Sequence, residues 1–124
     1  MRNFKFYSLL LLAFMVAQGC NKPLPNLEGI NLQQWRADKR GCNRVRTPMI
    51  GAIDGQKEKL KSLTENQIVS LLGTPDETQL EDRNQKFYYY YMEPAPFCEK
   101  PTSRPKKLIL RFNAMDLVYE TYVR

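Results

Sequence analysis

The residues that could carry chemistry in this chain are three cysteines and a short run of acids, and histidine is absent. Without histidine, Ser-His-Asp and Cys-His catalytic arrangements and histidine-ligated zinc sites are excluded. Carboxylate chemistry stays open, because four acids follow a predicted helix: Asp76, Glu77, Glu81 and Asp82. Glycosidase-type catalysis needs two carboxylates across a cleft, for which 124 residues leave little material. Acids gathered in a loop are usually solvated, so the sequence predicts no enzyme, no metal and no cofactor.

The first nineteen residues have the three parts of an export signal. Arg2 and Lys5 give a positive start, residues 6–17 give a short apolar stretch, and Gly19 precedes Cys20. The alternative is a transmembrane anchor, but about twelve apolar residues fall short of the roughly twenty that a spanning helix needs. The sequence therefore predicts a signal peptide over residues 1–19.

Residues 16–20, Val-Ala-Gln-Gly-Cys, resemble the lipobox of bacterial lipoproteins, although Ala17 and Gln18 are not its commonest residues. The resemblance implies cleavage before Cys20, a diacylglyceryl thioether on its sulfur, and a fatty acyl group such as palmitate on the new amine. Two or three acyl chains anchor a protein almost permanently. Because Asn21 is not the aspartate associated with inner-membrane retention, we expect an outer-membrane location, facing the periplasm.

Cys42 and Cys98 remain once Cys20 is lipidated. An even pair in an oxidising compartment predicts one disulfide. Closing a loop of about 57 residues would stabilise the fold by roughly 4 kcal/mol, as an upper figure. A reactive thiol or a metal site is the weaker alternative, since neither cysteine lies in a C-x-x-C motif and no histidine is present.

The mature chain contains one domain of about a hundred residues. We expect a polar tether over residues 20–26 and a folded domain over residues 27–124. Removing Arg2 and Lys5 leaves 17 basic and 13 acidic residues, a net charge of +4. This surplus can favour anionic headgroups or an acidic partner. Export argues against a nucleic-acid partner.

Helix signals fill the first half of the domain. Asn31 can cap a short helix that carries Leu32 and Trp35 on one face, and we expect Trp35 to anchor this segment to the domain. Thr47-Pro48 predicts the start of a longer helix, with Thr47 as its cap. Residues 64–67, Thr-Glu-Asn-Gln, predict a capping box. The short helix that this box opens should end at Gly73.

Strand signals fill the second half. Residues 85–92 are aromatic, residues 107–112 alternate between apolar and other side chains, and residues 117–123 follow a turn. Short connections favour antiparallel neighbours. The predicted class is α+β, with two helices packed on one face of a three-stranded antiparallel β-meander.

Three pieces in the same order resemble the SmpA/OmlA lipoproteins, a family that includes an accessory protein of outer-membrane β-barrel assembly. They are the helix ending in Gly-Thr-Pro at residues 63–75, the aromatic strand at 87–91 and the closing hairpin at 107–118. The similarity covers residues 60–124 and implies the two-helix, three-strand fold. β-Lactamase-inhibitor proteins share this architecture, so the fold names no function.

Alternation divides the aromatic strand into two sets of side chains. Aligned with the SmpA/OmlA strand, Phe87, Tyr89 and Tyr91 should face the helices. We expect a face on the open side that binds a protein partner, peptidoglycan or a lipid headgroup, with Ile109 and Val118 as neighbours. It comprises Tyr88, Tyr90, Met92, Arg111 and Tyr122. Its tyrosine, methionine and arginine content is typical of interfaces. The alternative is that residues 27–40 fold back and cover this face.

The sequence therefore predicts an outer-membrane lipoprotein that acts as a non-enzymatic scaffold or protein-interaction module in envelope or outer-membrane assembly. The expected partners are the membrane, through the lipid anchor, and an envelope protein. A secreted inhibitor-like or ligand-binding module on the same fold is the alternative.

Overall fold

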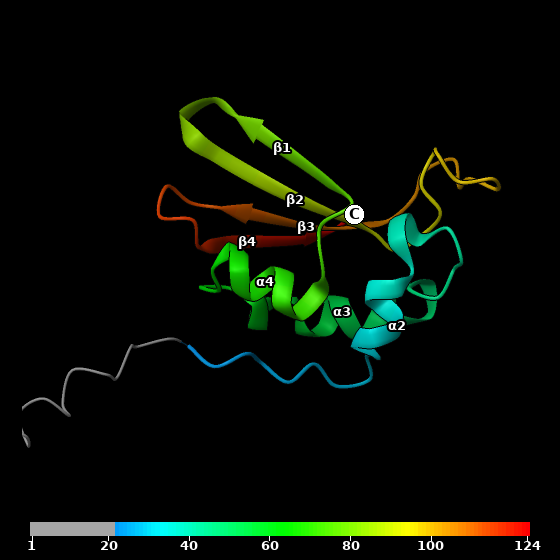
Figure 1. Cartoon of the computed structure of the whole chain (residues 1–124), viewed down its shortest axis with the longest axis horizontal. Helices are drawn as coiled ribbons and strands as arrows, with labels where there is room; N and C mark the ends of the chain where they lie inside the picture. Colours follow the sequence, from blue (N-terminus) through cyan, green and yellow to red (C-terminus); the bar gives the residue numbers. More distant parts are fainter. Residues whose placement is uncertain (1–21) are drawn as a thin grey trace, which may run out of the picture.

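Four strands form one antiparallel sheet in the computed structural model, which describes residues 22–124 (Figure 1). They are β1 (Glu77–Glu81), β2 (Gln85–Tyr91), β3 (Lys107–Phe112) and β4 (Val118–Val123), and they lie in chain order across the sheet. This is the meander that the sequence predicts, with one strand more. The signal peptide and the lipidation site at Cys20 lie outside the described residues.

The additional strand, β1, lies within the run predicted to be an acidic loop. Its sequence, Glu-Thr-Gln-Leu-Glu, holds one apolar residue, and Leu80 is 71% exposed. An edge strand pairs on one side only and here buries almost nothing, so it leaves no apolar alternation in the sequence. The three-residue turn η4 (Asp82–Asn84) joins it to β2, with Arg83 and Asn84 at positive φ.

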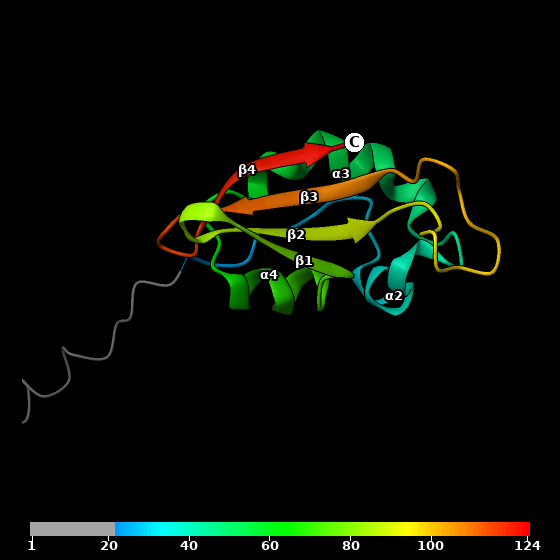
Figure 2. The same cartoon turned by 90° about the horizontal axis from the view of Figure 1, so that it is seen from above.

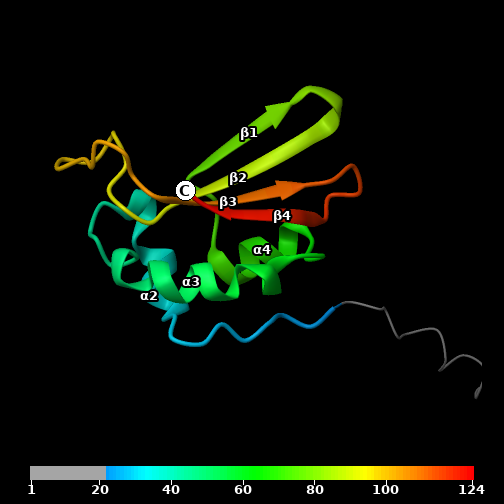
Figure 3. The same ribbon diagram turned by 180° about the vertical axis from the view of Figure 1, so that it is seen from behind.

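The helices all cover one face of the sheet, as Figures 1 and 3 show from opposite sides. They are α2 (Leu32–Ala37), α3 (Ile50–Gln56) and α4 (Glu65–Leu72), with 3₁₀ turns at η1 (Lys39–Gly41), η2 (Thr47–Met49) and η3 (Lys57–Leu60). The predicted longer helix is thus one short α-helix between two 3₁₀ turns. Gly51 and Gly55 within it are weak helix formers.

Two of the three predicted helix starts are confirmed by their hydrogen bonds. Asn31 accepts from the backbone N–H of Gln34, and Thr64 and Gln67 form the reciprocal capping box. The predicted cap at Thr47 is wrong, because this residue lies inside η2 and its hydroxyl donates to the carbonyl of Met92 at 2.7 Å. Thr47 therefore ties the helical layer to the end of β2.

The core lies between the helices and the sheet. Leu108, Leu110 and Phe112 alternate along β3 and are fully buried against the helical layer, which contributes Ile68 and Leu72 from α4. The closing strands thus pack as the alternating pattern of residues 107–112 predicts.

The N-terminal segment runs along the helical layer rather than over the sheet (Figures 1 and 3). Trp35 is fully buried, with its ring centroid 6.3 Å from that of Tyr90, so it anchors α2 as predicted. The residues predicted to be a free tether also contact the domain. Gln67 donates to the carbonyl of Lys22 at 2.6 Å, and Lys59 donates to that of Asn26 at 3.1 Å.

Candidate functional site

The prediction of which side chains of the aromatic strand are exposed is wrong. Tyr90 and Met92 are fully buried on the helical side, and Tyr88 lies on the same side with its hydroxyl 2.9 Å from a carboxylate oxygen of Glu65. Val118, expected as an exposed neighbour, is 2% exposed and belongs to the core.

The register of β2 against β3 explains this inversion. Tyr88 pairs with Leu110 and Tyr90 with Leu108, so each tyrosine shares the face of a buried leucine. The core accepts Tyr90 because its hydroxyl donates to the carbonyl of Gly73 at 2.7 Å. Alternation within one strand cannot reveal its pairing with the next.

The open face therefore carries the other aromatic set. Phe87 pairs with Arg111, Tyr89 with Ile109, and Tyr91 with Lys107. Across β3, Arg111 pairs with Glu120 and Ile109 with Tyr122, which confirms that Arg111 and Tyr122 lie on this face. We call the side chains of this surface the open face. It comprises Phe87, Tyr89, Tyr91, Lys107, Ile109, Arg111, Tyr119, Glu120 and Tyr122.

The open face is turned toward the viewer in Figure 2, and no described helix covers it. The loop after β2 covers one end of it, where Tyr91 is 5% exposed and packs with Ala95 and Cys98. The alternative, in which residues 27–40 cover the predicted face, is right for part of it, because Trp35 of this segment packs against Tyr90 in the core. The segment lies on the helical side and does not cover the open face (Figures 1 and 3). The face extends across β2, β3 and β4 and leaves Phe87 and Tyr89 only partly buried. Such a surface suits a macromolecule better than a small ligand, which binds in a concave pocket.

Cations stand over the aromatic rings of the open face. The ammonium of Lys107 is 5.3 Å from the ring centroid of Tyr89 and 5.2 Å from that of Tyr91. The guanidinium of Arg111 is 5.5 Å from the ring of Phe87 and 5.0 Å from that of Tyr119. These cation–π contacts fix flexible side chains before any partner arrives.

The tyrosine hydroxyls of this face donate to neighbouring side chains. Tyr91 donates to Glu77 at 2.7 Å and Tyr89 to Gln79 at 2.8 Å. Burial raises the pKa of Tyr91 to about 12, and the hydrogen bond to Glu77 adds to the rise. These hydroxyls are therefore neutral donors at physiological pH.

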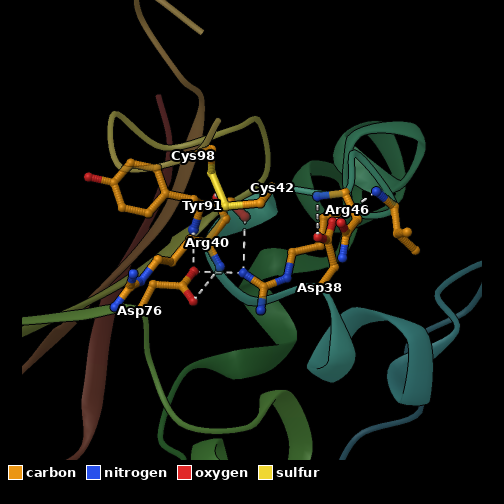
Figure 4. Close-up of a disulfide and its surroundings, with 9 residues drawn as sticks. Asp38, Arg40, Cys42, Arg46, Asp76, Tyr91 and Cys98 are labelled. Atoms are coloured by element: carbon orange, nitrogen blue, oxygen red, sulfur yellow. Dashed lines mark hydrogen bonds and ion pairs between the residues drawn. A yellow bond between two sulfur atoms is a disulfide. The ribbon is translucent and has the colours of Figure 1, made fainter. Parts of the chain in front are cut away.

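The predicted disulfide joins Cys42 to Cys98 (Figure 4). It links the segment after η1 to the loop between β2 and β3. The loop is also held by backbone bonds, from Ala95 N to the carbonyl of Arg40 at 3.0 Å and from Met92 N to that of Lys106 at 2.9 Å. The disulfide thus fixes one end of the domain.

A buried ion pair lies next to this disulfide (Figure 4). Arg46 contacts Asp76 at 2.6 Å, and their side chains are 1% and 3% exposed. Asp76 also accepts from the backbone N–H groups of Arg40 and Tyr91, while the guanidinium of Arg46 donates to the carbonyls of Trp35 and Tyr91. A second buried acid, Asp38, accepts three backbone N–H groups.

The structure places the four acids of the acidic run in different surroundings. Asp76 is committed to Arg46 and to backbone donors, and Glu77 accepts from Tyr91 on the open face. Glu81 and Asp82 are exposed at the far end of β1. Asp76 is a structural residue that sequence reasoning missed, and no local pattern marks its partner thirty residues earlier.

Comparison of this chain with protein-family models, with curated proteins and with solved structures finds no match. The similarity to SmpA/OmlA lipoproteins therefore stays a prediction from the residues that carry it. Within residues 22–124, no helix is long and apolar enough to cross a membrane. Over the same range, no three His, Cys, Asp or Glu side chains gather closely enough to hold a metal ion.

Proposed function

We propose that this chain is an exported, lipid-anchored, non-enzymatic module that docks an envelope protein on its open face. The observation that carries the proposal is the aromatic and cationic surface across β2, β3 and β4, which no helix of residues 22–124 covers (Figure 2) and which is already ordered by its own contacts. Tyrosine, phenylalanine and arginine are enriched where protein partners bury surface. Side chains held in place before binding lose less entropy when the complex forms.

The lipid anchor supports this proposal from the sequence side. Acylation of Cys20 would confine the protein to a membrane surface, where a docking module meets other envelope proteins at high effective concentration. The similarity of residues 60–124 to SmpA/OmlA lipoproteins makes outer-membrane assembly proteins the first partners to test.

The experiment is crosslinking in intact cells, followed by mass spectrometry of the captured proteins. We expect the Phe87→Ser/Tyr89→Ser variant to lose a partner that the native protein captures. The matched control is Leu80→Ser/Met115→Ser, because these side chains are 71% and 79% exposed and lie off the open face. An unchanged set of partners in the Phe87/Tyr89 variant would refute the docking face, and an equimolar complex with one soluble enzyme would favour an inhibitor-like module.

The anchor is tested separately by metabolic labelling with palmitate. Label on the native protein and none on Cys20→Ala is the expected result. A native protein without label, found in the soluble cytosolic fraction, would overturn the export part of the proposal.

A further inference from the structure

One end of the domain collects exposed basic side chains from two segments far apart in the sequence. We call it the basic end. It comprises Lys39, Arg40, Arg44, Lys100, Arg104 and Lys106, all exposed. In Figures 1 and 2 the two segments, around η1 and between β2 and β3, meet at the end opposite the one where the chain enters.

The charge of the described chain is concentrated at the basic end. Its six exposed cations and the two acids of the loop after β2, Glu93 and Glu99, sum to a net charge of +4. Two further acids lie beside Lys39 and Arg40, but both are buried: Asp76 is paired with Arg46, and Asp38 accepts backbone N–H groups. Residues 22–124 hold 17 basic and 13 acidic residues, so the remainder balances with eleven of each. The basic end is therefore strongly cationic, and Lys107 and Arg124 lie at the same end of the sheet.

The cations of the basic end are not neutralised within the described chain. The ion pairs of residues 22–124 involve Arg46, Lys57, Lys61, Lys86 and Arg111, and none of these belongs to the basic end. Cations held close together repel one another, which destabilises the fold. Surfaces normally mix both signs of charge evenly, so an end where exposed cations outnumber exposed acids this strongly indicates an anionic partner.

The fold holds the two basic segments together despite their repulsion. The disulfide between Cys42 and Cys98 joins them covalently. A hollow of about 470 Å³ lies beside it, lined by Cys42, Asn43, Arg44, Glu99 and Lys100. Next to it Phe97 is 71% exposed, with the guanidinium of Arg40 5.8 Å from its ring centroid.

The direction of the anchor decides which anion this end can meet. Lys22 is two residues beyond Cys20, and its carbonyl is bonded to Gln67 in the first turn of α4, at the other end of the domain. Two residues span at most about 7 Å. If Cys20 is lipidated, as proposed above, the basic end faces away from the anchoring membrane, so headgroups of that membrane are not its ligand.

We propose that the basic end docks onto the anionic cell-wall polymer, the peptidoglycan whose stem peptides carry free carboxylates. This inference rests on the proposed export and anchoring. Several exposed cations around an open hollow suit repeated carboxylates along a polymer better than one small anion, which needs convergent donors in an enclosed pocket. The protein would then join the membrane, through its lipid, to the wall.

The test is co-sedimentation of the full-length protein, extracted in detergent, with purified peptidoglycan sacculi. We expect sedimentation that weakens with added salt, because exposed charges are screened. The Lys100→Glu/Arg104→Glu/Lys106→Glu variant should bind about tenfold more weakly or worse. The control Lys57→Glu/Lys61→Glu/Arg83→Glu reverses the same number of charges away from the basic end and should stay within about threefold of the native protein.

Two further measurements distinguish binding to peptidoglycan from binding to lipid headgroups and from docking on the open face. Equal losses in both variants, or binding to vesicles of phosphatidylglycerol without binding to sacculi, would overturn it. The open-face variant Phe87→Ser/Tyr89→Ser should sediment with sacculi as the native protein does while losing its crosslinked protein partner. That contrast distinguishes failure of the wall contact from failure of the docking face.

Discussion

Asp76 shows how one buried side chain can hold several segments together. It joins Arg46 to the backbone of η1 and to the last residue of β2, at hydrogen-bond distances between 2.6 and 2.9 Å. A buried charge of this kind is costly to remove, because its partner is left in a low-dielectric site without compensation. Asp76 thus contributes to the stability of the fold.

We expect Asp76→Asn to lower the free energy of unfolding by about 3–5 kcal/mol, since Arg46 would stay buried without its counter-ion. Urea denaturation measures this change. Glu81→Gln is the control from the same acidic run, and because Glu81 is exposed its effect should stay within about 0.5 kcal/mol. Similar small losses in both variants would contradict the structural role of Asp76.

The tyrosines of β2 predict an alkaline limit to stability. Burial raises the pKa of Tyr88 and of Tyr91 to about 12, from an ordinary value of 10.0, with further contributions from Glu65 and Glu77. Because the folded pKa lies above the unfolded one, the stabilisation is complete below pH 10 and is lost as the pH rises from 10 to 12. Phenolate absorbance should accordingly appear at lower pH in urea-denatured protein than in folded protein.

Tyr91→Phe gives the matching variant for this titration. This variant lacks the ionisable hydroxyl, so its urea midpoint should fall less between a pH of about 8 and a pH of about 11 than the urea midpoint of the native protein does. A loss of the same size in both proteins would mean that ionisation of Tyr91 does not drive alkaline unfolding.

At the scale of elements, two glycines should respond in opposite directions to the same substitution. Gly41 ends η1 with φ +64°, and an added Cβ would lie 2.8 Å from the carbonyl oxygen of Glu93. Gly51 lies in α3, where an added Cβ meets nothing within 4 Å. The first glycine allows η1 to pack closely against the loop after β2, and the second only weakens a helix.

We predict that Gly41→Ala lowers the free energy of unfolding by at least about 1–2 kcal/mol, the cost of left-handed backbone for alanine. Gly51→Ala should raise the same free energy by about 0.5–1 kcal/mol, because alanine favours a helix. Thermal and urea unfolding of the two variants side by side provide the measurement. A stable Gly41→Ala protein would show that η1 can shift away from the loop without loss.

The elements differ in how well the sequence predicts them, and the reason is physical. The capping box at Thr64 and Gln67 depends on residues three apart, so the sequence alone identifies it. Strand β1 leaves no such local mark, because an exposed edge strand needs no apolar alternation. The open face depends on register between strands, and only the pairing of Tyr88 with Leu110 shows which aromatic set is buried.

At the scale of the whole molecule, the N-terminal end of the described chain and the basic end with its disulfide lie at opposite ends of the domain (Figures 1 and 2). The end that carries Lys22 would lie at the membrane if Cys20 is lipidated, and the basic end lies opposite. The surplus of +4 is visible in the sequence, but its concentration is not, because Arg44 and Lys100 belong to segments that only the fold brings together. The sequence does predict the bond that joins them, through the pairing of Cys42 with Cys98.

This arrangement predicts a salt-dependent contribution from the disulfide. Replacing Cys42 and Cys98 by serine frees a loop with a sequence separation of 56 and should cost up to about 4 kcal/mol of stability through chain entropy. Without the bond, repulsion within the basic end should add to this loss. Salt screens exposed charges over about 10 Å at 0.1 M and about 3 Å at 1 M, whereas loop entropy does not depend on it. The difference in urea midpoint between the native protein and the double serine variant should therefore be smaller at about 1 M salt than at low salt. Equal differences at both salt concentrations would show that repulsion between the cations of the basic end does not destabilise the variant.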